Sequence, residues 1–282
     1  MNLAACIRAT LIVDELGLVS ARLGDCWLST RFLALHRHES GSVAPAAAMA
    51  RLAARCGGTY VGLVRLMAAL PAAERLLVDC AARAAHVANV AACDPLPAAP
   101  VFLDVDPASI PNERLAAEVV EALGAIVALV RVDPRRLVLR LRATGWARDE
   151  LASVVADGAR HGGMGISLAG FEGSGEDSAM LDRIDPDYVA FAPSWYRQAA
   201  RSGPARALLR AVAAAIRDHG AVPVVPAIDD AWAYREALGM GPLLMGGRFL
   251  APAISAGGTF EGLHAFGTAQ ADDDGKVVRL FG

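Results

Sequence analysis

The chain has 282 residues, a net charge of -3, and a composition in which 55% of the residues are hydrophobic. This length suits one large α/β barrel or two small domains, and it is enough to bury a core. The lack of a basic surplus argues against a nucleic acid polymer as partner. We find no apolar stretch suited to cross a bilayer and no basic leader, so we expect no membrane partner and no export signal.

The cysteines are few and scattered, and none of them forms a Cys-x-x-Cys pair. Such a set predicts reduced, buried thiols in a cytoplasmic protein rather than disulfides or a zinc site. The five residues are Cys6, Cys26, Cys56, Cys80 and Cys93.

The first hundred residues mix strand and helix signals. Residues 7–13 predict a strand with 19–22 pairing back as a hairpin, and residues 26–35 predict another strand. His36-x-His38 at the end of that strand resembles a metal pair, but no carboxylate cluster accompanies it, and a polar strand end or loop is the favoured interpretation. Helices are predicted over residues 46–55 after Pro45, 60–70 and 72–90.

From residue 101 onward, short apolar strands alternate with helices. This alternation indicates a (β/α) barrel or an open doubly wound sheet, and the strand count and glycine-rich strand ends favour the barrel. The type of the apolar run at residues 126–132 stays ambiguous. Strands are expected at 101–105, 137–141, 165–168, 188–191, 221–225 and 243–245, with helices at 112–123, 148–160, 202–217 and 229–238.

A glycine-rich loop follows the strand at residues 165–168, where ligand sites lie in parallel sheets and barrels. Glu176 and Asp177 in this loop could act as general acid or base, or could cap the next helix. Ser174 lies between glycines but does not form a Gly-x-Ser-x-Gly elbow. His161 and Glu172 complete this alternative set of site residues.

The order of these segments resembles the EAL domain family, the cyclic di-GMP phosphodiesterases that are built on a modified TIM-type (β/α)8 barrel. The resemblance spans residues 10–255. The family's strand of Glu-Ala-Leu, leucine and arginine corresponds to Leu33–Arg37, and the following Pro-Ala to Pro45-Ala46. Further landmarks correspond to Val101–Pro107, Arg140–Ala143, Ala169–Gly175, Ala190–Ala192, Val225–Asp230 and Met245–Gly247.

The resemblance implies hydrolysis with two divalent cations held by carboxylates at the barrel mouth. Most of the corresponding positions here carry no oxygen ligand, and only Asp104 retains a carboxylate. We therefore predict no metal site, no cofactor and no catalytic residue. The vacated positions are Leu33, Asp104, Arg140, Ala169, Gly170, Ala190, Ala227 and Met245.

Alternation along the strands gives a specific expectation for the vacated mouth. Asp104 and Arg140 point inward from neighbouring strands if the family register holds, so a buried charge there needs a partner. We hypothesise that Arg140 occupies the space of the lost metal and pairs with Asp104 or Asp106. The alternative is that Arg140 and Arg142 reach from a strand end into solvent.

These expectations lead to a catalytically inactive EAL-like domain that acts in bacterial signalling through contacts with a protein partner, and that can form a homodimer. The alternative is a receptor that binds cyclic di-GMP without hydrolysis. Arg37, which matches the family arginine near the ligand phosphate, supports this receptor, whereas the lost polar groups count against it. A third option is an unrelated TIM-barrel enzyme. The barrel domain is expected over residues 1–260, followed by a loosely ordered tail over residues 261–282.

Overall fold

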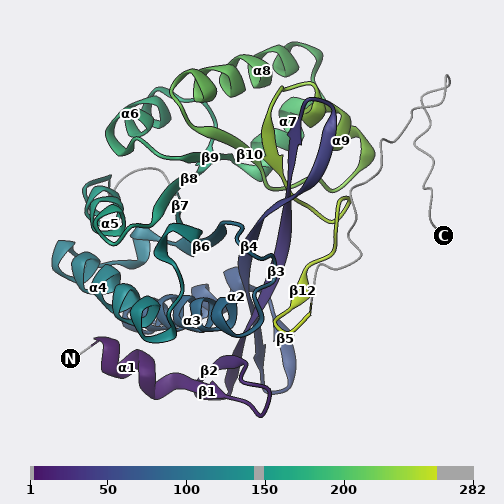
Figure 1. Cartoon of the computed structure of the whole chain (residues 1–282). Helices are drawn as coiled ribbons and strands as arrows, with labels where there is room; N and C mark the ends of the chain where they lie inside the picture. Colours follow the sequence, from purple (N-terminus) through teal and green to yellow (C-terminus); the bar gives the residue numbers. More distant parts are fainter. Residues whose placement is uncertain (1–2, 143–148, 259–282) are drawn as a thin grey trace, which may run out of the picture.

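Eight strands close into a barrel in the computed structural model, which describes residues 3–142 and 149–258 (Figure 1). The first barrel strand, β3, runs antiparallel to its two neighbours, β4 and β11, and the other six neighbouring pairs are parallel. This closure confirms the predicted TIM-type barrel. The ring runs β3 (Cys26–Glu39), β4 (Ser42–Cys56), β6 (Val101–Val105), β7 (Leu137–Arg142), β8 (Gly165–Phe171), β9 (Tyr188–Phe191), β10 (Val222–Val225) and β11 (Leu243–Met245).

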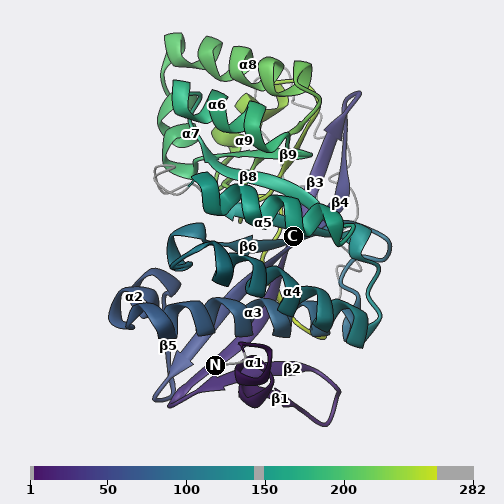
Figure 2. The ribbon, with the colours of Figure 1, turned by 90° about the vertical axis from the view of Figure 1, so that its left-hand side faces the viewer.

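Helices surround the barrel, and short strands extend one of its sides (Figure 2). The helices are α1 (Leu3–Thr10), α2 (Leu63–Ala69), α3 (Ala72–Cys93), α4 (Glu113–Val130), α5 (Asp149–His161), α6 (Gly175–Ile184), α7 (Pro193–Ala200), α8 (Gly203–Asp218) and α9 (Ala231–Leu238), with 3-10 turns at Pro107–Ser109 and Pro134–Arg136. The further strands are β1 (Leu11–Val13), β2 (Val19–Leu23), β5 (Thr59–Val61) and β12 (Ile254–Ser255).

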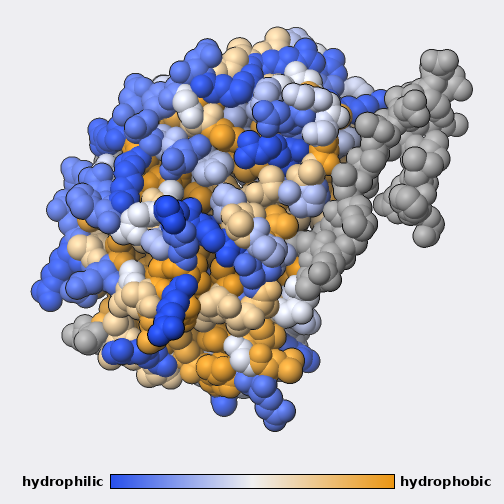
Figure 3. Space-filling view, viewed as in Figure 1, coloured by the Kyte–Doolittle hydropathy of each residue, from blue (hydrophilic) through white to orange (hydrophobic). Residues whose placement is uncertain are grey.

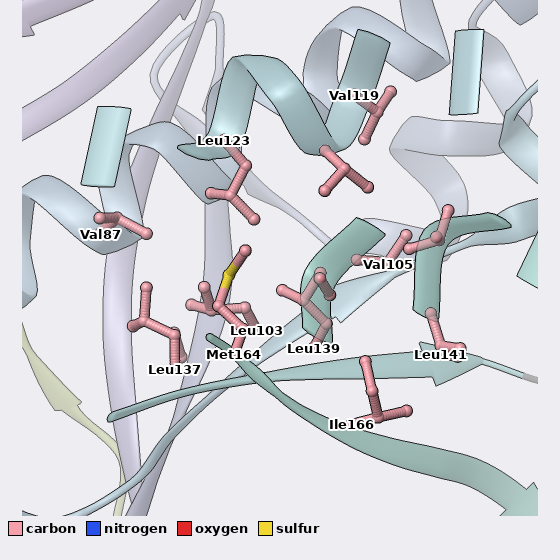
Figure 4. Packing of buried hydrophobic residues seen from close by; sticks show 14 of the residues in the cluster. Val87, Leu103, Val105, Val119, Leu123, Leu137, Leu139, Leu141, Met164 and Ile166 are labelled. Atoms are coloured by element: carbon pink, nitrogen blue, oxygen red, sulfur yellow. The ribbon is translucent and has the colours of Figure 1, made fainter. Parts of the chain in front are cut away.

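The largest apolar cluster lies between the barrel wall and the helices α3, α4 and α5. Leu103, Leu139 and Ile166 point outward from β6, β7 and β8 and meet Val87 and Leu123 of the covering helices (Figure 4). Because successive strand residues alternate between faces, the residues between these fill the barrel interior. That interior layer comprises Leu35, Ala47, Met49, Phe102, Val138, Ala169, Ala190, Val224 and Leu244.

The strands β3 and β4 are longer than the other strands and form a hairpin that extends beyond the barrel. Their pairing runs from Glu39 opposite Ser42 to Cys26 opposite Cys56. The predicted helix over residues 46–55 is therefore wrong. Ser40 and Gly41 have φ angles of 53° and 80°, and this left-handed turn sends the chain back along β3. Cross-strand pairing then overrides the helix preference of the alanines.

Two further expectations about elements need correction. Residues 7–13 do not form one strand, because helix α1 occupies Leu3–Thr10 and buries Leu3 and Ile7 before β1 begins. The ambiguous run at 126–132 belongs largely to α4, which ends at Val130. The predicted hairpin is confirmed, since β1 pairs antiparallel with β2.

Cys26 and Cys56 form a disulfide across the β3–β4 hairpin. The expectation that all five cysteines are reduced is therefore wrong for this pair. The two residues lie 30 apart in sequence, and the spacing alone gives no sign that they face each other. The helical prediction for residues 46–55 hid this contact. Cys6, Cys80 and Cys93 are free thiols.

Helix α3 is long and apolar enough to cross a membrane by length and composition, contrary to the sequence-based expectation. In this fold it is a core helix, since 72% of its apolar window is buried. On the face shown in Figure 3, apolar residues gather in the lower half, around α2, α3 and the N-terminal strands. The proposed tail over residues 261–282 lies outside the described residues.

Candidate functional site

The carboxyl ends of the parallel strands meet at one mouth of the barrel. Asp104 on β6 lies opposite Arg140 on β7, and Arg140 lies opposite Ser167 on β8. On the other side, the β4–β6 register continues to place Arg51 beside Asp104. The mouth therefore joins one carboxylate with two guanidiniums from three neighbouring strands.

Ion pairs fix the position of Asp104. The Arg140 Nη1 atom lies 2.5 Å from its Oδ1, and the Arg51 Nη1 atom lies 3.6 Å from its Oδ2. Next to them, Arg142 Nη2 lies 3.1 Å from Asp106 Oδ2. The hypothesis that Arg140 pairs with Asp104 is confirmed. The alternative in which Arg140 reaches into solvent is wrong, because its side chain is only 7% exposed.

The charge balance keeps Asp104 ionised. Burial alone would raise the pKa of this carboxyl group, but Arg140, Arg51 and Arg142 outweigh that effect, so its pKa lies below the ordinary value of 3.8. Its oxygens already face two guanidiniums, which repel a divalent cation at the same place.

A second ion pair, on helix α3, lies next to Asp104 at the mouth. Arg83 and Asp79, one turn apart on α3, form a salt bridge, and Arg83 also donates to the main-chain carbonyl of Asp104 at 3.1 Å. This pair lines a cavity of about 80 Å³ together with Arg142 and His86. Burial raises the pKa of Asp79 even though Arg83 opposes it. Sequence analysis did not identify this pair.

A buried chain of hydrogen bonds connects α3 with β2 and β3. The Asn89 side chain accepts from the Val19 amide and donates to the Val19 carbonyl, both at 2.7 Å. Asn89 also donates to the Thr30 hydroxyl at 2.9 Å, and this hydroxyl lies 2.8 Å from His86 Nδ1. Burial lowers the pKa of His86 to about 4, so the imidazole is neutral at pH 7. His86 and Asn89 are three residues apart on α3, which was the available sequence signal.

Arg37 does not belong to the mouth. Because β3 is antiparallel, the residue level with Asp104 is Arg31, opposite Arg51. Arg37 lies six residues further along the strand, or about 20 Å at 3.3 Å per residue. It is exposed and lies 3.9 Å from Glu39. Its assignment to a ligand phosphate at the mouth is therefore wrong.

The other vacated positions are mainly apolar lining. Ala169 and Ala190 face each other inside the barrel, and Leu33 lies at the mouth beside a cavity. Gly170 interrupts the β8–β9 register as a bulge with a φ of 93°. Met245 packs in the apolar cluster with residues of α7, α8 and α9, outside the interior layer, and buried Ala227 lies beyond the end of β10.

Three members of the alternative set around the glycine-rich loop form a helix cap, in which the Glu172 amide donates to the Asp177 carboxylate at 2.9 Å. Ser174 accepts from the Asp177 amide, and Asp177 accepts from the Ser174 amide, so the capping interpretation is confirmed. His161 instead contacts the carbonyl of Asp157 at the end of α5.

The two histidines at the end of β3 lie in different environments. His36 is buried, and burial lowers its pKa to about 4, whereas His38 contacts the Gly241 carbonyl at 3.3 Å. Within residues 3–142 and 149–258, no three His, Cys, Asp or Glu side chains are grouped to hold a metal ion.

An open cavity of about 620 Å³ lies over the mouth. Arg31, Arg51 and Arg248 contribute positive charge to its wall, while Asp229 contributes the opposing charge. Asp229 is paired with Arg248 at 3.3 Å and with Arg197 at 3.7 Å. The cavity can accept a small anionic ligand, but its guanidiniums do not suit a metal ion.

The closed barrel with one antiparallel strand, and the charged cluster at its strand ends, define a TIM-type barrel with a mouth site. The sequence profile of the EAL domain family matches residues 19–253. The chain belongs to the EAL domain family. No curated protein matches the sequence significantly.

Solved structures share the fold at low sequence identity. The EAL domain of FimX from Pseudomonas aeruginosa, bound to cyclic di-GMP, is 15% identical with a TM-score of 0.69, and the match covers 80% of this chain and 90% of that one. BlrP1 from Klebsiella pneumoniae, with calcium and cyclic di-GMP, is 18% identical with a TM-score of 0.66, over 81% and 56% of the two chains. The present chain thus spans little more than half of BlrP1.

Proposed function

We propose that this chain is a non-catalytic EAL domain that acts as a regulator or scaffold in cyclic di-GMP signalling. The observation that supports it most strongly is the 2.5 Å contact between Arg140 and Asp104. Hydrolysis by two cations requires several free carboxylates at the mouth, whereas Asp104, Asp106 and Asp229 are each already paired with a guanidinium. The residues present do not fit the metals that the family implies.

A revised register strengthens this proposal. In the family motif, an arginine follows the glutamate by four residues. Ala47–Arg51 on β4 has this spacing, and β4, unlike β3, carries its arginine to the mouth beside Asp104. In this register the glutamate position is Ala47, which lies buried in the barrel interior. Either register therefore leaves the strand without its carboxylate.

The direct test is incubation of the full chain with cyclic di-GMP and Mg²⁺ or Mn²⁺, with the products separated by chromatography. We expect no linear dinucleotide above the level of a sample without protein. Arg140→Glu should not by itself restore turnover, because Ala47, Ala169 and Ala190 still supply no ligand. Turnover that a chelator abolishes would contradict the proposal.

A second candidate function is a receptor that binds cyclic di-GMP without hydrolysis. The 620 Å³ cavity with Arg31, Arg51 and Arg248 at its wall favours it, since guanidiniums bind phosphates well. Calorimetry with cyclic di-GMP should then show binding that Arg51→Ala weakens by at least tenfold. Arg114→Ala, at an exposed position on α4, is the matched control. The absence of a heat of binding would contradict the receptor function and leave the scaffold function as the remaining candidate.

Homodimerisation and a protein partner stay predictions, which light scattering and capture from native extract can check. A cytoplasmic location also stays a prediction. The Cys26–Cys56 disulfide counts against this location, because such bonds persist in oxidising compartments.

A further inference from the structure

A row of alternating arginines and aromatic residues crosses the hairpin extension. Arg22 on β2 lies opposite Trp27 on β3, Trp27 lies opposite Arg55 on β4, and Arg55 lies opposite Tyr60 on β5. Directly opposed residues share one face of a sheet. Arg22 stacks 5.6 Å from the Trp27 ring, and Arg55 stacks 5.8 Å from the Tyr60 ring. We call these four residues the arginine–aromatic row.

The row is exposed and positively charged. Trp27 is 44% exposed and Tyr60 is 77% exposed. Within the described ranges, neither Arg22 nor Arg55 has a carboxylate within 4.0 Å, and their Nε atoms donate to the carbonyls of Gly24 and Gly58. Arg31 follows Trp27 by four residues and therefore lies on the same face of β3. Its guanidinium donates to the Ala253 carbonyl.

This combination fits an acidic segment. Guanidiniums that bind only main-chain carbonyls retain donors for carboxylates, and the stacked rings hold them in place. A second copy of the same face is a poor occupant, because arginine would meet arginine. The cavity over the mouth adjoins the row through Arg31 and Tyr60, but its acidic residue, Asp229, is already paired.

The described chain ends beside this face. Strand β12 runs antiparallel to β3, with Ser255 opposite Arg31, and the Ala256 amide donates to the Thr30 carbonyl at 3.0 Å. Residues Ser255–Gly258 then form a turn, in which the Gly258 amide donates to the Ser255 carbonyl at 3.0 Å, so the chain leaves β3 before it reaches the level of Trp27. Gly257 lies against Leu18, at the start of β2. Residues 259–282 follow, and they contain the acidic run Asp272–Asp274.

Length and charge therefore select one occupant. The fourteen residues from 259 to 272 can extend about 46 Å, whereas four paired strands span about 14 Å. We propose that Asp272–Asp274 of this chain docks on the arginine–aromatic row. Exposed ion pairs are individually weak, and the tether compensates by giving an effective concentration on the order of millimolar.

A disulfide trap in the full chain tests this proposal. Ser29→Cys places a thiol on the exposed face between Trp27 and Arg31, and Gln270→Cys places one beside the acidic run. We expect the linked 29–270 peptide by mass spectrometry, at a rate independent of protein concentration. The matched control is Ser178→Cys with Gln270→Cys, since Ser178 is an exposed serine on α6; this pair should link at least tenfold more slowly.

Charge variants separate docking from chance contact. Asp272→Asn with Asp273→Asn and Asp274→Asn should slow the 29–270 link at least tenfold, as should Arg22→Glu with Arg55→Glu. Combining Arg22→Glu and Arg55→Glu with Asp272→Lys, Asp273→Lys and Asp274→Lys should restore the rate. Equal rates for the 29 and 178 pairs, no effect of the asparagines, or a rate that rises with protein concentration would each overturn the proposal.

Discussion

Arg140 is the residue on which the proposed function rests, because its guanidinium lies 2.5 Å from Asp104, where it would repel a cation. The pairing could be predicted from the sequence, since alternation alone puts both side chains on the inner face of neighbouring strands. Arg51 could not be found in the same way. Its strand was predicted as a helix, so no inward face could be assigned to it.

Truncation of Arg140 should destabilise the fold. Arg140→Ala removes the closest partner of the partly buried Asp104 carboxylate and leaves the longer contact with Arg51, at 3.6 Å, so we expect a loss of about 3 kcal/mol in the free energy of unfolding. Arg135→Ala removes an exposed pair with Asp133 and should lower the free energy of unfolding far less. Urea denaturation of both variants checks this, and equal losses would contradict the account.

Acidification should lower the free energy of unfolding through the buried His86 on α3. The pKa of His86 is about 4 in the fold and 6.5 in the unfolded chain. Between these values the unfolded state binds the extra proton, so stability falls as the pH decreases from 6.5 to 4, by up to about 3 kcal/mol.

The comparison that isolates this histidine uses His86→Gln, which keeps an acceptor for Thr30 and does not titrate. The free energy of unfolding of this variant should change less between pH 7 and pH 4.5 than that of the wild type. Identical pH profiles would show that His86 is not held neutral. Buried His36, whose pKa is also about 4, contributes equally to both profiles.

Among the secondary-structure elements, strand β4 of the β3–β4 hairpin could not be predicted from the sequence, whereas most other barrel strands could. The strands from β6 to β11 were predictable, because each is a short apolar run between clear breaks. The stretch that became β4 was not, since its alanines have a strong helix propensity and only the turn at Ser40–Gly41 and pairing with β3 override it. The resulting strand also moves the mouth arginine from Arg37 to Arg51.

The attachment of β2 to α3 depends on one side chain. Asn89→Ala removes both hydrogen bonds to Val19 and the one to Thr30, so buried main-chain groups lose their partners. We expect a loss of about 2 kcal/mol and faster hydrogen exchange at the Val19 amide. Cys93→Ala, one turn later on α3, is the control, because its thiol only donates to the Asn89 carbonyl. Unchanged exchange at Val19 would contradict this role.

For the whole molecule, the barrel and its family could be predicted from the order of segments, although no single motif in the sequence is diagnostic by itself. The chemistry of the mouth follows from the charges that line it, and their balance depends on closure of the ring between β3 and β11. Sequence spacing cannot show that closure, because β3 and β11 lie some two hundred residues apart.

Manganese titration of the full chain, followed by electron paramagnetic resonance, tests the central claim most directly. If Arg140 occupies the place of the metal, the signal of free Mn²⁺ should rise linearly from the first addition, for the wild type and for Asp104→Asn alike. Stoichiometric loss of the free signal in the wild type, abolished by Asp104→Asn, would show that the mouth holds a metal and would contradict the account.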